Sequence, residues 1–134
     1  MAQQEKYFIR QLSYTLALAI IGFVIHNFRE FGFAGLFAME AATIPWSLIG
    51  IAGLLAWVYI PQARKFAALF LIFYAALNLI GGGILSVLPL SIFPFEPEQS
   101  ISHYISHVIY GVSQIPLIWL CIQSFSLKEA KNDS

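Results

Sequence analysis

Four long apolar segments divide this chain of 134 residues, and polar residues gather between them. The segments carry almost no formal charge and extend over residues 11–28, 43–60, 66–88 and 101–125. At 1.5 Å of rise per residue, even the shorter segments reach about 27 Å as helices, close to the thickness of the hydrocarbon core of a bilayer. They lack the alternation of period two that marks the strands of membrane barrels. We therefore predict four transmembrane helices.

Prolines and short connections determine how the predicted helices follow one another. Pro61 closes the second segment, and Arg64 and Lys65 lie in a turn of only a few residues. A connection this short makes the second and third helices antiparallel. The chain contains no internal repeat and no long linker, so the pattern predicts a single membrane domain over residues 1–134. We expect an all-α integral membrane protein that folds as an up-down bundle of four transmembrane helices.

Lysine and arginine residues collect at one end of this predicted bundle. The six residues at that end are Lys6, Arg10, Arg64, Lys65, Lys128 and Lys131. The opposite end holds only Arg29. Because cytoplasmic loops carry an excess of positive charge, we predict that both termini are cytoplasmic. The predicted location is the cell membrane, which the chain crosses several times.

The composition supports a membrane environment and excludes several other classes of protein. The chain is 59% hydrophobic and 10% charged, whereas a soluble domain is about 45–50% apolar and about 25% charged. A soluble domain of this size cannot bury that much apolar surface, so the excess faces lipid or a partner. A formal net charge of +0 and one cysteine exclude a nucleic-acid binder and a disulfide scaffold. The expected partners are membrane lipids, and a homo-oligomer or a larger membrane complex remains open.

All three histidines fall near the outer ends of the first and fourth helices, as His26, His103 and His107. Ionisable groups at membrane depth are costly and tend to face a bundle interior, so this cluster is a candidate site. His103 and His107 are four residues apart and present their imidazoles on one helix face, as two ligands of one metal ion do. His26, Glu30 and Glu40 lie at the same level and are the candidates for the remaining ligands, His26 through nitrogen and the two glutamates through oxygen. Such a mixed set of nitrogen and oxygen ligands favours zinc or iron over calcium or magnesium.

Further polar residues extend this cluster toward the middle of the membrane. Tyr110 and Gln114 continue the face of the fourth helix that carries the two histidines, and Asn78 lies on the third helix. Arg29 lies one turn beyond the first histidine. The pattern predicts a polar pocket that opens outward, with Asn78, Tyr110 and Gln114 in its deeper part and Arg29 near its mouth.

Glu40 is the candidate catalytic residue of this pocket. It is the one charged residue in a run that is otherwise apolar from Phe31 onward. A carboxylate in such surroundings is suited to accept a proton or to complete the shell of a metal ion. Farther along the chain, three successive glycines at residues 81–83 predict that the third helix unwinds near the pocket.

The sequence leaves several functions open. A metal-binding protein, or an enzyme that uses the metal on a small or lipidic substrate, is one of them. A transporter or solute-binding subunit would use the same pocket without metal. A haem held by His26 and one of the other histidines would make an electron-transfer protein. An accessory subunit would pack its small residues, such as Gly50, Gly53 and Ala56, against another membrane protein. Finally, the histidines have a structural interpretation, as members of a hydrogen-bond network without any ligand.

Overall fold

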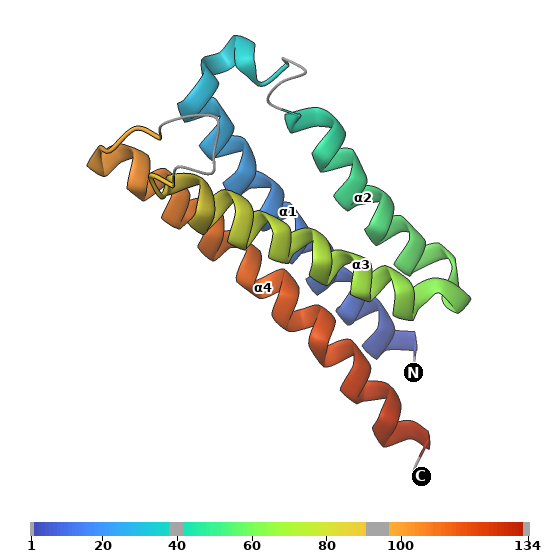
Figure 1. Ribbon diagram of the computed structural model, residues 1–134. Coiled ribbons are helices and arrows are strands. Elements are labelled where there is room, and N and C mark those ends of the chain that lie inside the picture. Colours follow the sequence, from blue (N-terminus) through green and yellow to red (C-terminus); the bar gives the residue numbers. More distant parts are fainter. Residues whose placement is uncertain (1, 38–41, 91–96, 133–134) are drawn as a thin grey trace.

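The computed structural model describes residues 2–37, 42–90 and 97–132, and within these ranges it contains helices and no strands (Figure 1). The elements are α1 (Ala2–Gly35), α2 (Thr43–Tyr59), η1 (Pro61–Ala63), α3 (Arg64–Leu77), η2 (Asn78–Ile84), η3 (Leu85–Val87) and α4 (Ile101–Asn132). The all-helical prediction is confirmed for these residues. The first helix is longer than the predicted residues 11–28, because charged residues at both of its ends continue the helix beyond the apolar segment.

Among the described residues, three helical stretches are long and apolar enough to cross a membrane. They are Gln3–Gly35, Pro61–Val87 and Ile101–Phe125. The helix α2 is apolar but has only 17 residues, which corresponds to about 26 Å at the usual rise of an α-helix. Large apolar side chains also cover the outer faces of the helices, as at Ile21, Phe73 and Trp119, which are 53%, 61% and 64% exposed. A surface of this kind is suited to lipid.

The helices pack side by side, with α4 against both α1 and α3, and α2 against α3 (Figure 1). Leu12, Leu71, Leu117 and Cys121 are among the residues at the centre of the resulting core. Both marked termini lie near the same end of the helices (Figure 1). The packing therefore brings the end of α1 that carries His26 next to the beginning of α4.

The three successive glycines do not unwind the third helix. The segment Asn78–Ile84 stays helical but takes the wider turn of a π-helix, which is often found near functional sites. A Cβ atom at Gly82 would lie 2.0 Å from Cε1 of Tyr110, and one at Gly83 would lie 2.8 Å from Cα of Gly111. The glycines at these two positions thus allow α4 to approach closely, and the expectation of an unwound segment is wrong.

The small-residue face of α2 is already occupied within the chain. Gly50 and Gly53 are buried, and Cβ atoms there would lie 2.9 Å from Cζ of Tyr74 and 2.8 Å from Cδ1 of Phe70. These glycines therefore allow close packing of α2 on α3. An accessory role through Gly50 and Gly53 as a docking face for another protein is not supported.

Candidate metal centre

The three histidines meet between α1 and α4. Nε2 of His26 lies 3.2 Å from Nε2 of His107, although the two residues are 81 positions apart in the sequence. Their ring centroids are 4.3 Å apart, and the rings of His103 and His107 are 4.4 Å apart. His103 and His107 are buried, and His26 is partly buried. The fold thus brings together the imidazoles that the sequence places at one level of the membrane.

A neighbouring amide determines which nitrogen of His26 carries the proton. Nδ1 of His26 lies 3.0 Å from Oδ1 of Asn27. The amide nitrogen of Asn27 donates to Oγ1 of Thr43 at 2.8 Å, which identifies Oδ1 as the oxygen atom that faces the histidine. Because this oxygen only accepts, Nδ1 of His26 is the donor. In the neutral ring, Nε2 of His26 therefore presents a lone pair.

The π-helix has the same effect on His107. Nδ1 of His107 lies 2.5 Å from the backbone carbonyl oxygen of Gly82. A carbonyl oxygen has no hydrogen to donate, so Nδ1 carries the proton and Nε2 again presents a lone pair. The same carbonyl accepts a second hydrogen bond from the hydroxyl of Ser86 at 2.6 Å. The glycine segment thus supplies the acceptor that orients the ring.

Two nitrogen atoms that each carry a lone pair consequently lie 3.2 Å apart. Two neutral imidazoles in these tautomers repel one another unless a proton or a metal cation lies between them. A tetrahedral zinc ion with bonds of about 2.0–2.1 Å to nitrogen holds two such atoms about 3.3 Å apart. The observed separation therefore matches two ligands of one ion.

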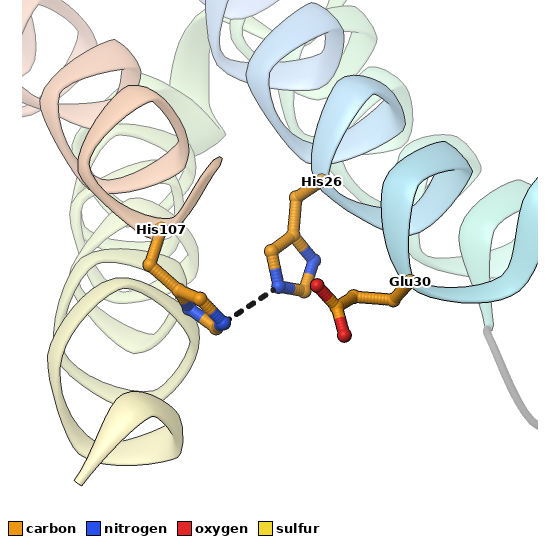
Figure 2. A group of neighbouring side chains, drawn as sticks. All are labelled: His26, Glu30 and His107. Carbon is orange, nitrogen blue, oxygen red and sulfur yellow. Dashed lines mark hydrogen bonds between the residues drawn. The ribbon is translucent and has the colours of Figure 1, made fainter. Parts of the chain in front are cut away.

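Glu30 supplies an oxygen atom beside the two nitrogens (Figure 2). Candidate ligand atoms of His26, Glu30 and His107 all lie within 4.8 Å of one another, so these residues could hold a metal ion. Oε1 of Glu30 is 3.0 Å from Nη1 of Arg29 and 3.0 Å from Nδ1 of His103. These donors orient the carboxylate and stabilise its charge. The arrangement follows the usual pattern in which outer groups orient metal ligands.

His103 has a different position from the other two histidines. Its Nδ1 donates to Glu30, so that Nε2 presents the lone pair. Nε2 of His103 is buried and has no hydrogen-bond partner among the described residues. It is not part of the group of three residues whose ligand atoms converge. In this arrangement His103 orients Glu30, and its role as a direct metal ligand remains a prediction.

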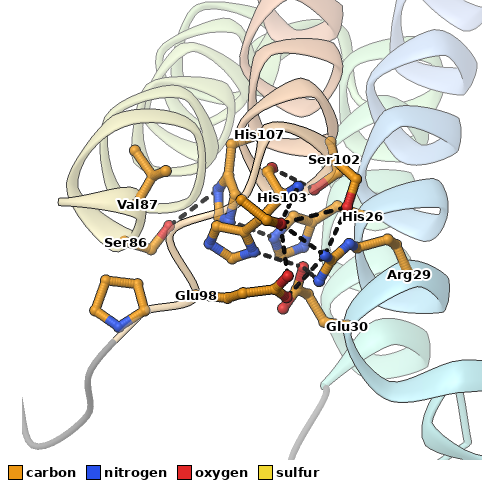
Figure 3. Close-up of polar contacts among 12 residues, drawn as sticks. His26, Arg29, Glu30, Ser86, Val87, Glu98, Ser102, His103 and His107 are labelled. Atoms are coloured by element: carbon orange, nitrogen blue, oxygen red, sulfur yellow. Dashed lines mark hydrogen bonds and ion pairs between the residues drawn. The ribbon is translucent and has the colours of Figure 1, made fainter. Parts of the chain in front are cut away.

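Arg29 joins this cluster to the segment that precedes α4 (Figure 3). Its Nη2 atom lies 2.7 Å from Oε2 of Glu98 and donates to Oγ of Ser102 at 2.9 Å. The hydroxyl of Ser100 donates to Glu98 at 2.5 Å. This hydrogen bond and the one from Arg29 lower the pKa of Glu98 below its usual value of 4.5. Arg29, which the sequence analysis placed near the mouth of the pocket, thus connects α1 to the start of α4.

The deeper polar residues form hydrogen bonds between helices. The hydroxyl of Tyr110 donates to Oδ1 of Asn78 at 2.5 Å, and Nε1 of Trp46 donates to the same atom at 2.8 Å. Nε2 of Gln114 donates to the carbonyl oxygen of Ala19 at 3.0 Å. Asn78, Tyr110 and Gln114 are each at most 4% exposed. Their polar atoms are used to join α2, η2 and α4 and to join α4 to α1, and a role in lining a pocket remains a prediction.

Sequence reasoning did not identify every residue of the site, and one predicted residue, Glu40, is not among the described residues. Glu40 is outside the described residues, so its predicted roles in catalysis and metal binding have no structural counterpart here. Sequence reasoning missed Asn27 and the carbonyl of Gly82. The position of Asn27 next to His26 was the feature of the sequence that could have identified Asn27. The glycine run pointed to irregular backbone, but not to the carbonyl that faces His107.

Comparison with other proteins supplies no relative from which a function could be transferred. No protein-family model, no curated protein and no solved structure matches this chain. The function is therefore inferred from the chain's own residues and their geometry.

Proposed function

We propose that this protein is an integral membrane protein of four antiparallel spans that binds one transition-metal ion, zinc or iron, near its non-cytoplasmic surface. His26, Glu30 and His107 are the proposed ligands. The observation that carries the proposal is the approach of two imidazole lone pairs to 3.2 Å beside the Glu30 carboxylate. Six of the seven lysine and arginine residues belong to the other end of the predicted bundle, which supports cytoplasmic termini.

Two histidines and one carboxylate leave coordination positions open. This ligand set is typical of catalytic zinc sites and of non-haem iron sites, where water or a substrate occupies the open position. The metal would supply a bound water of lowered pKa or a Lewis acid. Glu30 and the two histidines would hold the ion, and His103 and Arg29 would keep the carboxylate in place. Metal-assisted chemistry on a small or lipidic substrate is the reaction class that this arrangement supports.

A shared proton is the second candidate occupant of the same position. The distance of 3.2 Å between the two Nε2 atoms also fits a hydrogen bond from a protonated imidazole to a neutral one. In that case the cluster would act in a transporter or a solute-binding subunit without metal. A haem between His26 and His107 fits poorly, because two axial nitrogens need about 4 Å between them, with iron bonds of about 2 Å on each side.

Metal analysis of the full chain, purified in detergent without chelators, tests the proposal. We expect one zinc or iron ion per chain, and cobalt added to the metal-free protein should give the visible bands of a nitrogen and oxygen site. His26→Ala and His107→Ala should each lower metal affinity at least tenfold. Cys121→Ala is the matched control, because it removes the one thiol of the chain from the core and should leave the metal in place.

The outcomes separate the candidate functions. A wild-type chain that binds none of zinc, iron or cobalt, while remaining folded by circular dichroism, would contradict the metal proposal and favour the shared proton. Equal metal content in the wild type and both histidine variants would show that the metal is held elsewhere. A strong Soret band in the absorption spectrum would indicate haem instead.

A further inference from the structure

A second cluster of polar and aromatic residues lies at the other end of α1 and α4, away from the histidines. A groove of about 380 Å³ runs between the two helices there. The residues that line it include Gln11, Tyr14, Thr15, Pro116, Trp119 and Gln123. Tyr14 and Trp119 are 67% and 64% exposed, so the groove opens at the outer surface of the helices. Its walls therefore face the lipid that surrounds a membrane protein.

A smaller polar hollow of about 290 Å³ lies farther toward the N-terminus of α1, and Lys6, Tyr7 and Arg10 are among its lining residues. Arg10 and Tyr14 are four residues apart, so the hollow and the groove adjoin along the helix surface. Among the described residues, neither Lys6 nor Arg10 has a carboxylate partner, whereas the nearby Glu5 pairs with Arg64. The hollow thus presents two cationic side chains that have no carboxylate partner in the part of the chain whose side chains are described.

The order of chemical groups along these two helices matches that of a phospholipid. Lys6 is outermost. Arg10 and the amide side chains of Gln11 and Gln123 come next at about one level, because α4 runs opposite to α1 and Gln114 contacts the carbonyl of Ala19. The rings of Tyr14 and Trp119 lie deeper. A phospholipid presents a phosphate, then ester carbonyls, then an acyl chain in the same sequence.

We propose that this groove and hollow together bind one anionic phospholipid. Lys6 and Arg10, which both belong to α1, bind the phosphate, since lysine and arginine near an anionic membrane surface attract its headgroups. Gln11 and Gln123 donate hydrogen bonds to the ester carbonyls, and one acyl chain lies against Trp119. This inference takes from the proposed function only that α1 and α4 cross a bilayer, and it does not depend on a bound metal.

Fluorescence quenching in detergent micelles tests the proposal with the full chain. The probe is phosphatidylglycerol with bromine atoms on its acyl chains, and brominated phosphatidylcholine is the comparison lipid. We expect saturable quenching of tryptophan fluorescence by the anionic lipid at low mole fraction, and only weak, unsaturable quenching by the zwitterionic lipid. Trp119→Phe should abolish the saturable component, because the other two tryptophans lie outside the groove.

Replacement of both cations tests the headgroup contact. Lys6→Gln combined with Arg10→Gln should weaken binding of the anionic lipid about 30-fold, which is about fivefold per cation. Lys65→Gln, which removes a cation outside the hollow, should leave the affinity unchanged. Equal quenching by both lipids, or unchanged affinity in the double variant, would overturn the proposal. The proposal would also be overturned if neither lipid quenched the tryptophan fluorescence of the wild type and the Tyr14→Cys variant crosslinked to a second copy of the chain through this groove. Because metal content is measured in a separate experiment, the result for lipid binding and the result for metal binding do not depend on each other.

Discussion

The Nδ1 atoms of all three histidines contact hydrogen-bond acceptors, and this shared feature determines what the cluster can do. The acceptors are of three kinds: a side-chain amide, a backbone carbonyl and a carboxylate. Each one places the proton on Nδ1 and leaves the lone pair on Nε2, the atom that would bind a metal. Histidines that served only as surface or interfacial residues would have no need of such consistent orientation. The arrangement is the one expected where the rings are held ready for a cation.

Gly82 is the residue whose replacement tests the contact between the π-helix and α4. A Cβ atom at this position would lie 2.0 Å from the buried ring of Tyr110, which is itself hydrogen-bonded to Asn78. We expect Gly82→Ala to lower the free energy of unfolding by about 1–3 kcal/mol, as other overpacked interiors do. Thermal unfolding in detergent, followed by circular dichroism, measures the change.

Gly81 provides a matched control within the same helical segment. A Cβ atom there has no neighbour within 4 Å. Gly81→Ala should therefore be neutral or slightly stabilising, since alanine favours helices more than glycine does. If both variants melted at the same temperature as the wild type, the close packing of Gly82 on Tyr110 would be contradicted.

At the scale of elements, the segment before α4 is held to α1 by the ion pair between Arg29 and Glu98. The pKa of Glu98 is lowered in the folded protein, first by the hydroxyl of Ser100 and then by Arg29. A lowered pKa means that folding favours the ionised form, so this contribution to stability is complete above pH 4.5 and is lost as the pH falls through the lowered value. The expected effect is small, because Glu98 is exposed and solvent screens the pair.

The pH dependence of thermal unfolding checks this contribution. We expect the wild type to lose stability relative to Glu98→Gln as the pH falls from 6 to 3, until the two converge. The difference should also shrink at high salt, since salt screens exposed charges. A difference between the two proteins that stayed constant across this pH range would show that ionisation of Glu98 does not act in this way.

The apolar segments predicted the helices well, but not where the helices end. The apolar stretch ends near residue 28, yet α1 stays helical past Arg29 and Glu30, kinks at Gly32, where φ is 67° and ψ is -173°, and ends at Gly35. Hydropathy marks the part of a helix that lies in hydrocarbon, whereas the helix itself ends where its backbone hydrogen bonds do. Beyond Phe28 the charges of Arg29 and Glu30 are paired with each other and do not interrupt the helix. The glycine run indicated irregular backbone in the third helix, but not that the segment Asn78–Ile84 stays helical with the wider turn of a π-helix.

The depth of the candidate site along the helices was predictable from the sequence. The groups around the histidines that orient their rings were not. Counting residues along antiparallel helices placed His26 level with His103 and His107, and the structure brings these rings together. The carbonyl of Gly82 completes the orientation of His107. A backbone acceptor has no side chain to recognise in a sequence, so it appears only once the fold is known.

At the scale of the whole molecule, the two ends of the helices differ in chemistry. The histidine cluster occupies one end, and Lys6 and Arg10 occupy the other. The proposed topology has the cationic end in the cytoplasm, because lysine and arginine are retained on that side. In that orientation, the cytoplasmic leaflet would supply the anionic lipid and the opposite compartment would supply the metal. It can be measured without reference to either ligand.

Single cysteines in a Cys121→Ala background test the orientation. Gln62, in the short turn before α3, and Gln99, before α4, are both exposed, and they lie on opposite sides in the proposed topology. A membrane-impermeant maleimide should label Gln99→Cys in intact cells, and should label Gln62→Cys only after the membrane is permeabilised. The reverse pattern would place the histidines on the cytoplasmic side. Labelling of both residues in intact cells would contradict a single span, Pro61–Val87, that crosses the membrane between them, because the two ends of such a span contact different compartments.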